Sequence, residues 1–482
     1  MKTTNENWSL QNSYIELPSS FYKKVKPSKV KNPKLVYFNR KLSKQLNLEF
    51  LNNDFSKITG YLSGNIVPDN SNPIAQAYAG HQFGHFTMLG DGRAILLGEQ
   101  KASDDRFFDI QLKGSGKTPF SRAGDGRATL SSMLREYLMS ESMHFLNIPT
   151  TRSLAVINTG ERVFREKINI GGILSRVSSS HIRVGTFEYA KHFCSENDFK
   201  DFIDYVIKRY YPDISSSNSP CTDLLKTVMR IQIDLVISWI RVGFIHGVMN
   251  TDNMSITGET IDYGPCAFMN KYNPKTVFSS IDRYGRYAFG NQHKIAYWNL
   301  SVFAGTLLPF IHKDQNEAID LAQSILDEFS SYFTNNWYRM MFSKIGITNP
   351  EKSDEKFIND LLELMELHNA DYTNTFLSLT LNESNKDLLF QSPDFKNWLK
   401  KWKDRVKNDK NSQIIMKKNN PIYIPRNHLV ESALNNAING NKEEFDKILH
   451  QMSNTYEYDV KLDKFQTTPD GFDETYKTFC GT

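Results

Sequence analysis

Residues 246–266 read HGVMNTDNMSITGETIDYGPC. Four groups with acid–base or metal-binding chemistry lie in this short segment: His246, Asp252, Asn253 and Asp262. The amide oxygen of Asn253 and the carboxylate of Asp262 are hard ligands that suit Mg²⁺. Asp252, the neighbour of Asn253, can accept a proton. The alternative is a polar loop without chemistry. Such a loop would not usually follow so apolar a helix and then enclose a short apolar strand before its second acidic residue.

Upstream of this segment, residues 86–114 predict three strands. FTMLGDGRAILLGEQ (86–100) places two apolar runs around the turn Gly90-Asp91-Gly92-Arg93. FFDIQLKG (107–114) alternates apolar and polar residues and ends at Lys113 and Gly114. Glycines allow backbone N–H groups to approach a phosphate closely. An Asp-Gly pair is also common in ordinary hairpin turns, so this alternative stays open.

Apolar residues recur at helical spacing from residue 130 to 146, which predicts a long helix that Asp125 can cap. Glu136 lies at the margin of the apolar stripe and can point at the sheet. A helix carboxylate of this kind holds a phosphate-binding strand lysine by an ion pair, here Lys113. The alternative is two unrelated surface charges.

Two further groups can bind anions. Gly124-Asp125-Gly126-Arg127 stands at the predicted helix start, where free N–H groups attract negative charge; a capping turn is the alternative. Arg176 and Arg183 can fork onto phosphate oxygens, and two surface arginines are the alternative.

The order of these parts is that of a protein kinase: glycine turn, strand lysine, helix glutamate, His…Asn and Asp-aromatic-Gly. His246 and Asn253 have the spacing of a kinase catalytic loop, and Asp262-Tyr263-Gly264 stands where Asp-Phe-Gly would be. Val248 occupies the position of the usual kinase base. The sequence thus contains the parts of a protein kinase in order but lacks the usual base.

The chain divides by residue pattern into five predicted regions. They are an N-terminal extension (1–75), a kinase-like N-lobe (76–185), a kinase-like C-lobe (186–330), a helical C-terminal region (331–455) and an extended C-terminal tail (456–482).

Composition excludes several classes of protein. With 58 Lys and Arg against 54 Asp and Glu, a net charge of +4 is not that of a dedicated nucleic-acid binder. Four cysteines are too few and too scattered for a disulfide framework or a zinc ribbon. His81 and His85 have no suitably spaced acidic third ligand, so we assign no zinc to them.

The N-terminus has neither a signal-peptide nor a transit-peptide pattern. The uncharged window 295–312 contains polar residues and a proline, which favours a buried helix over a membrane span. We expect a cytoplasmic protein, a monomer, without nucleic-acid or membrane partners.

The chain resembles the selenoprotein O family of protein adenylyltransferases, called YdiU in bacteria. The resemblance extends over most of the chain and is weaker in the first 70 residues and in 330–450. It is carried by AGHQFGHF (79–86), LGDGRAILLGE (89–99), DIQLKGSGKTPFSRAGDGRATLSSMLREYLMSE (109–141), HGVMNTDNMSITGETIDYGPCAFM (246–269) and YKTFCGT (476–482).

This resemblance implies an α+β, protein-kinase-like bilobal fold that binds ATP in reversed orientation. It implies transfer of AMP from ATP to Ser, Thr or Tyr hydroxyls of proteins, with release of pyrophosphate. Asp252 matches the proton acceptor, and Asn253 and Asp262 match the ligands of Mg²⁺ or Mn²⁺. The matching ATP-binding positions are Gly90, Gly92, Arg93, Lys113, Asp125, Gly126, Arg176, Arg183 and Asp262.

The resemblance also suggests a regulatory disulfide between Cys266 and Cys480, which would tie the tail to the catalytic loop; two unrelated reduced thiols are the alternative. Two other activities stay open: protein phosphorylation, which the kinase-like order favours but Val248 weakens, and a non-catalytic ATP-binding pseudokinase scaffold. The residues do not exclude UTP in place of ATP.

Overall fold

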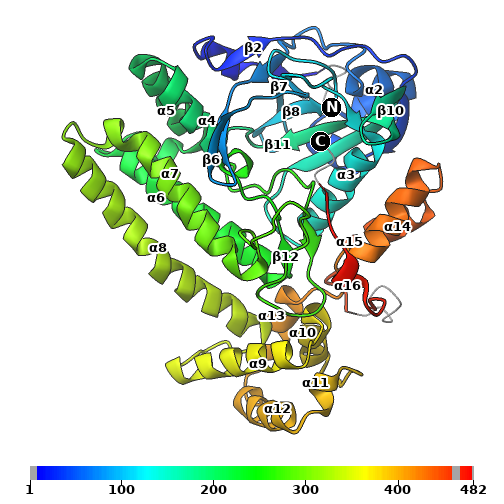
Figure 1. The fold of residues 1–482 in the computed structure, drawn as a ribbon, viewed down its shortest axis with the longest axis vertical. Coiled ribbons are helices and arrows are strands. Elements are labelled where there is room, and N and C mark those ends of the chain that lie inside the picture. The colour runs from blue at the N-terminus through cyan, green and yellow to red at the C-terminus, as the bar shows by residue number, and fades with distance from the viewer. Residues whose placement is uncertain (1–7, 459–466, 480–482) are drawn as a thin grey trace, which may run out of the picture.

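The computed structural model describes residues 8–458 and 467–479, which form a large antiparallel sheet and many helices (Figure 1). Within the described residues, nine strands form this sheet in the order β2–β4–β7–β8–β11–β10–β3, with β1 paired to β7 and β9 to β11. The remaining strands form the pairs β5–β6 and β12–β13. The mixed α+β class predicted from the sequence is confirmed. The strands are β1 (Leu10–Gln11), β2 (Tyr22–Lys24), β3 (Lys34–Phe38), β4 (Ile74–Gln76), β5 (Ala79–Gln82), β6 (His85–Met88), β7 (Ala94–Lys101), β8 (Phe107–Lys113), β9 (Ala128–Thr129), β10 (Arg152–Phe164), β11 (Ile168–Ser178), β12 (Phe244–Ile245) and β13 (Ala267–Phe268).

Both faces of the central strands are covered by apolar side chains. Successive residues of a strand point to opposite faces, so Leu174 of β11 packs in the main core with α3, while Ile173 packs with Leu48 and Ile58 of the N-terminal segment. Strands β1, β2 and β3 belong to the same sheet, so residues 8–75 are structurally continuous with it.

The strands on either side of the glycine turn 90–93 are present, but they do not pair with each other. Strand β6 pairs with β5, whereas β7 pairs with β1, β4 and β8. The alternative of an ordinary hairpin turn is therefore wrong. The turn connects two separate sheets.

Helix α3 begins later than the sequence predicted. It spans Leu130–Phe145, and the Thr129 side chain accepts a hydrogen bond from Ser132 N at its start. Asp125 does not cap it, because the two-residue strand β9 intervenes and the Asp125 carboxylate pairs with Arg165 at 2.9 Å. The prediction that 124–127 forms a helix N-terminus is thus wrong.

Helices dominate the chain after residue 184, as predicted. Helices α6, α7 and α8 pack against one another, and α14 and α15 lie against α3 (Figure 1). Trp398 and Trp402 of the basic helix α12 are buried. No helix in the described ranges is both long and apolar enough to cross a membrane. The helices are α1 (Arg40–Gln45), α2 (Phe55–Leu62), α3, α4 (Val184–Phe193), α5 (Glu196–Tyr210), α6 (Pro220–Arg241), α7 (Gln292–Ile311), α8 (Gln315–Lys344), α9 (Glu355–Leu367), α10 (Tyr372–Leu381), α11 (Leu388–Gln391), α12 (Pro393–Val406), α13 (Ser412–Asn419), α14 (Asn427–Ile438), α15 (Glu443–Ser453) and α16 (Phe472–Thr475).

The segment 246–264 is fastened to the sheet side of the molecule by backbone hydrogen bonds. Val184 N donates to Met254 O at 2.9 Å, and Thr260 N donates to Pro149 O at 2.9 Å. This attachment places the polar loop next to the end of β8, where Lys113 lies.

The described part of the predicted tail is not wholly extended. Residues 467–479 contain the short helix α16, and Thr478 N donates to Phe278 O at 2.8 Å. The tail therefore lies along the segment that follows the polar loop.

Candidate active site

Lys113 stands at the centre of a buried charge cluster at the end of β8. Its Nζ donates to Glu136 Oε2 at 2.6 Å and to Asp262 Oδ1 at 3.1 Å. Lys113 is 6% exposed and Glu136 3%. The ion pair predicted between strand lysine and helix glutamate is therefore present, and the alternative of two surface charges is wrong.

The second carboxylate oxygen of Glu136 binds Arg176. Arg176 Nη1 lies 3.2 Å from Glu136 Oε1, and its Nη2 donates to Gln111 Oε1. Arg176 is buried rather than a surface residue. Glu136 reaches both cations because the start of α3 lies very close to β11: a Cβ added at Gly172 would stand 2.7 Å from the Cα of Leu130.

The glycine turn 90–93 is tied to the same strands through Asp91. This buried carboxylate accepts hydrogen bonds from Gln76 N at 3.2 Å and from Gln111 Nε2 at 3.1 Å. Gly90 has φ +100°, a region that favours glycine, and any Cβ there would clash with Phe120. The turn is therefore rigidly held against the central strands.

Asp252 lies in the short 3-10 helix Thr251–Asn253, labelled η4 in the structure, and is 8% exposed. Its Oδ1 has no hydrogen-bond partner within the described residues. Arg183 Nη1 donates to the Asp252 backbone oxygen at 3.1 Å, and the Arg183 guanidinium lies 4.3 Å from the centre of the Tyr78 ring. Like Arg176, Arg183 is buried, so the alternative of two surface arginines is wrong.

Asn253 and Asp262 present oxygen atoms that fit a hard divalent cation. Asn253 Nδ2 donates to Val248 O at 3.1 Å, which leaves the amide oxygen available as a ligand. Asp262 gives one oxygen to Lys113 and adopts the left-handed backbone conformation at φ +67°. A backbone held in this sparsely populated conformation makes Asp262 a candidate for a functional position. A cation held by two protein ligands needs further oxygens, and phosphates of a nucleotide can supply them.

The two aspartates of the loop differ in proton affinity. Burial raises the pKa of Asp252 to about 6, although Arg183 acts in the opposite direction. Burial also disfavours the charged form of Asp262, but Lys113 and Arg93 outweigh it and hold the pKa of Asp262 well below its usual value. Asp262 thus stays ionised, which is the form in which a carboxylate can bind a cation, while Asp252 can exchange a proton near neutral pH.

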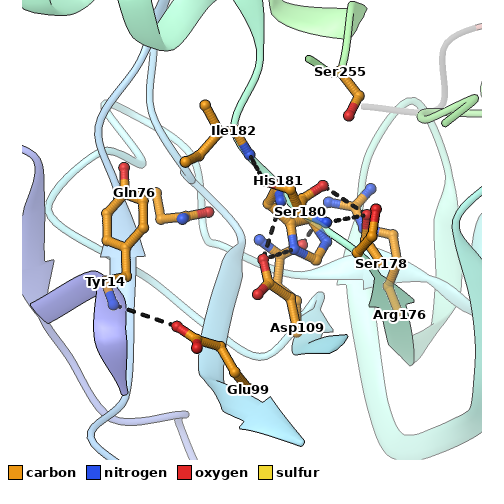
Figure 2. A network of polar contacts seen from close by, with 12 residues as sticks. Tyr14, Gln76, Glu99, Asp109, Arg176, Ser178, Ser180, His181, Ile182 and Ser255 are labelled. Carbon is orange, nitrogen blue, oxygen red and sulfur yellow. Dashed lines mark hydrogen bonds and ion pairs between the residues drawn. The ribbon is translucent and has the colours of Figure 1, made fainter. Parts of the chain in front are cut away.

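Several buried side-chain nitrogen atoms around these residues lack a partner within the described part of the chain. Arg176 Nε, His181 Nε2 and Arg183 Nη2 belong to this set. His181 Nδ1 lies 3.0 Å from Asp109 Oδ2, beside Arg176 and Ser178 (Figure 2). Buried donors are normally satisfied, so unpartnered arginine nitrogens here fit an anionic ligand such as phosphate.

Asp91, Gln111 and the Asp109–His181 pair are functional candidates that the sequence motifs alone do not reveal. A signal for part of this set was available. Asp109, Gln111 and Lys113 alternate along β8, and residues at i, i+2 and i+4 share one face of a strand. Three polar groups on one face of a central strand indicate a polar site.

Gly126 and Asp125 lie at the edge of this arrangement. Gly116 N donates to Gly126 O at 3.0 Å, and a Cβ at Gly126 would clash with the Gly116 backbone. Asp125 is exposed and paired with Arg165. The residues 114–117 and 124–127 therefore pack together as two crossing loops.

Cys266 is buried and its Sγ lies 3.3 Å from Tyr263 O. Cys480, its suggested partner, lies outside the described residues. Thr478 Oγ1 donates to Pro265 O at 2.7 Å, so the described tail reaches the residue before Cys266.

Comparison with known proteins gives a consistent result over the whole chain. The model of the family described as protein adenylyltransferase SelO matches residues 5–453. A protein nucleotidyltransferase YdiU from Brevibacillus brevis is 50% identical over 485 residues, covering 100% of this chain and 99% of the relative. Proteins of the same name from Clostridium perfringens and Bacillus cereus are each 50% identical, over 481 and 486 residues. These matches cover 98% of both chains for the first and 100% of both for the second.

Proposed function

Because this chain belongs to the SelO family of protein adenylyltransferases, we propose that it transfers AMP from ATP to Ser, Thr or Tyr hydroxyls of proteins and releases pyrophosphate. The chain is a nucleotidyltransferase, like its curated relatives. Within that class, we propose ATP as the nucleotide, protein hydroxyls as the acceptor and a specific set of residues that binds and orients them.

The state of Asp252 is the observation that carries the proposal. Val248 occupies the position of the kinase base, and its backbone N donates to His246 Nδ1 at 3.3 Å. Asp252, four residues later, is buried, has one carboxylate oxygen without a partner among the described residues and has a pKa raised to about 6 by burial. A carboxylate in this state suits a general base at neutral pH.

In the proposed reaction, the acceptor hydroxyl oxygen attacks the α-phosphorus of ATP. The new bond joins that oxygen to the α-phosphorus, and the bond from the α-phosphorus to the bridging α–β oxygen breaks. The hydroxyl proton passes to Asp252, and pyrophosphate leaves with the bonding electron pair. Positioning and charge neutralisation account for most of the catalysis in such transfers.

Lys113, Arg176 and Arg183 supply the positive charge that binds the phosphates in this proposal, and Glu136 orients Lys113. Asn253 and Asp262 hold the cation, Mg²⁺ or Mn²⁺, which when bound neutralises phosphate charge. The further ATP contacts proposed from the family match are Gly90, Gly92, Arg93, Asp125, Gly126 and Asp262.

The fold and organisation remain part of the same proposal. A kinase-like bilobal arrangement is supported by two packed units. One is the large sheet with α3 packed on it, and the other is the group of helices α6, α7 and α8; the polar loop 246–264 lies between them in the proposal. The proposed regions are those predicted above: 1–75, 76–185, 186–330, 331–455 and 456–482. A monomer acting in the cytoplasm, with no nucleic-acid or membrane partner, likewise stays a prediction.

Redox control through Cys266 and Cys480 also stays a proposal. It is supported by the contact of Thr478 with Pro265. Burial raises the pKa of Cys266 to about 12, and a thiolate is the reactive form of cysteine. We therefore expect slow disulfide formation with an added disulfide oxidant, which accepts the two electrons and two protons that the thiols lose.

The test is incubation of the protein, under reducing conditions with MgCl₂ or MnCl₂, with ATP labelled at the α- or the γ-phosphate. Asp252→Ala and Asp262→Ala serve as site variants, and Asp320→Asn, an exposed change on α8, serves as the matched control. Protein labelled from α-ATP only, in the wild type and control but in neither site variant, supports AMP transfer. Label from γ-ATP only would establish a kinase, and no label with ATP still bound would favour the scaffold. A parallel reaction with α-labelled UTP measures the nucleotide preference.

A further inference from the structure

A hollow of about 660 Å³ lies between the hairpin β5–β6 and the segment 281–295. Phe83 and His85 line one wall, and Arg283, Tyr284, Arg286 and Lys294 line the other. We call this hollow the entry groove. None of these residues belongs to the phosphate-binding cluster.

Both walls of the entry groove are fastened to the residues just before Asp252. Phe83 N donates to Asn250 Oδ1 at 3.1 Å, and Tyr287 OH donates to the same oxygen at 2.6 Å. His81 N donates to Thr251 Oγ1 at 2.7 Å. Asn250 is two residues from Asp252, so the groove adjoins the proposed proton acceptor.

The hairpin also covers Asp252 directly. A Cβ added at Gly80 of β5 would stand 2.4 Å from Asp252 Oδ1, so only glycine permits this approach. An acceptor hydroxyl that reaches Asp252 therefore passes close to the hairpin and the groove.

The charge of the entry groove is strongly one-sided. Arg283 and Lys294 are exposed, and Arg286 Nε is buried without a hydrogen-bond partner among the described residues. The single carboxylate of the lining, Asp282, already accepts from the backbone N of Arg286 at 2.9 Å and of Tyr287 at 2.8 Å. Its charge is therefore held within the loop.

A second hollow, of about 510 Å³, continues this basic surface. It shares Asp282, Arg283 and Gly285 with the entry groove and adds Lys275 and Lys477. The whole chain carries a net charge of only +4, so the excess of cations here is local. A local basic surface beside a catalytic loop attracts and orients an acidic ligand.

Exposed apolar side chains lie at the mouth of the entry groove. Tyr284 is 98% exposed and Ile281 52%. Aromatic, aliphatic and arginine side chains together are typical of surfaces that bind other proteins.

We propose that the entry groove binds an acidic segment of the acceptor protein and thereby brings a neighbouring hydroxyl to Asp252. This inference rests on the proposed function, since it names the class of protein segment that the same site would accept. The acidic side chains pair with Arg283, Arg286 and Lys294, and the apolar mouth contacts residues beside them.

The test measures binding of two fluorescein-labelled peptides to the full-length protein by fluorescence polarisation, without nucleotide. Both peptides contain one tyrosine, flanked in one by glutamates and in the other by lysines. The test variant is Arg283→Glu with Lys294→Glu. The matched control is Lys313→Glu, an exposed residue beyond the other end of α7, about 30 Å from Lys294.

We expect the wild type and the control to bind the acidic peptide more tightly than the basic one. The double reversal replaces two attractions by two repulsions, so we expect it to weaken acidic-peptide binding by roughly tenfold or more. The thermal midpoint of each variant confirms that it is folded.

Three results would overturn the inference: no preference for the acidic peptide, equal binding by the wild type and the double variant, or displacement of the peptide by ATP. The last would place the peptide in the phosphate site. Because the assay needs no AMP transfer, its failure is distinct from failure of the proposed function, which the labelled-ATP assay detects separately.

Discussion

The candidate site has two sides that hold their charges differently. On the strand side, formed by β8, β11 and α3, Lys113 and Arg176 both pair with Glu136. On the loop side, formed by 246–264, Asp252 is buried and one of its carboxylate oxygens has no partner among the described residues. The first side is built from directly paired charges, and the second contains a carboxylate that makes no direct ion pair among the described residues.

This difference indicates that the paired charges of the strand side contribute to stability, whereas Asp252 of the loop side contributes to the reaction. A paired, buried charge supports the fold around it, and removing one partner leaves the other unpaired. An unmatched carboxylate costs stability, but it remains free to take a proton. We therefore expect variants on the strand side to weaken stability and ATP binding together, and variants of Asp252 to lose transfer without weakening either the fold or ATP binding.

The largest effect is expected for Asp252→Asn. The amide keeps the shape of the side chain but cannot accept the hydroxyl proton, so we expect AMP transfer to fall by about 10³-fold. ATP affinity, measured by calorimetry, should stay within about threefold of the wild type, since Asp252 is not among the cationic groups that bind phosphate. If ATP affinity fell by the same factor as AMP transfer, Asp252 would act in ATP binding, and the two sides of the site would not differ in role.

Lys113→Met is expected to affect the fold and the reaction together. The change leaves Glu136 and Asp262 without this cation, and loss of one partner of a buried pair costs about 3–5 kcal/mol of unfolding free energy. We expect transfer to fall by about 10²-fold or more and ATP affinity to fall with it. Chemical denaturation and calorimetry measure the two effects, and Lys113→Arg, which keeps the charge, is the control. Unchanged stability in Lys113→Met would contradict the structural role of the pair.

A smaller, pH-dependent effect is expected in the stability of the metal-free protein. The folded pKa of Asp252, about 6, lies above its ordinary value of 3.8. Between these values the folded state binds more protons than the unfolded state, so stability contributed by Asp252 falls as pH rises. Asp252→Asn avoids this cost. We expect the variant to gain up to about 3 kcal/mol over the wild type above pH 6, and the gain to vanish near pH 4.

Thermal unfolding across this pH range, with chelator present, measures that gain. The exposed Asp320→Asn serves as the control and should show no pH-dependent difference. A variant that is less stable than the wild type at neutral pH would show that Asp252 is a structural carboxylate.

Much of the strand side follows from the sequence because its determinants are local. Alternation in FFDIQLKG placed Lys113 at a strand end, and helical spacing placed Glu136 toward the sheet. What failed depended on distant partners or on competing local choices. The pairing of β6 with β5 instead of β7 is set by long-range contacts, and Thr129 caps α3 in place of Asp125.

The loop side was located by residue type and spacing, but its physical state could not be predicted. Burial of Asp252 depends on the approach of Gly80, which lies 172 residues earlier in the chain. The roles of Asp91 and Gln111 likewise depend on contacts between strands. Such contacts carry no signal in a single sequence beyond the alternation of polar residues along β8.

The most direct test is to incubate the wild-type protein and, separately, Asp252→Asn with Mg²⁺ and ATP, and then to measure the intact mass of each protein. We expect the mass of the wild-type protein to increase by that of an AMP group, and the mass of Asp252→Asn to stay unchanged although the variant still binds ATP. Addition of a phosphate group instead, or undiminished addition of AMP by Asp252→Asn, would contradict this expectation.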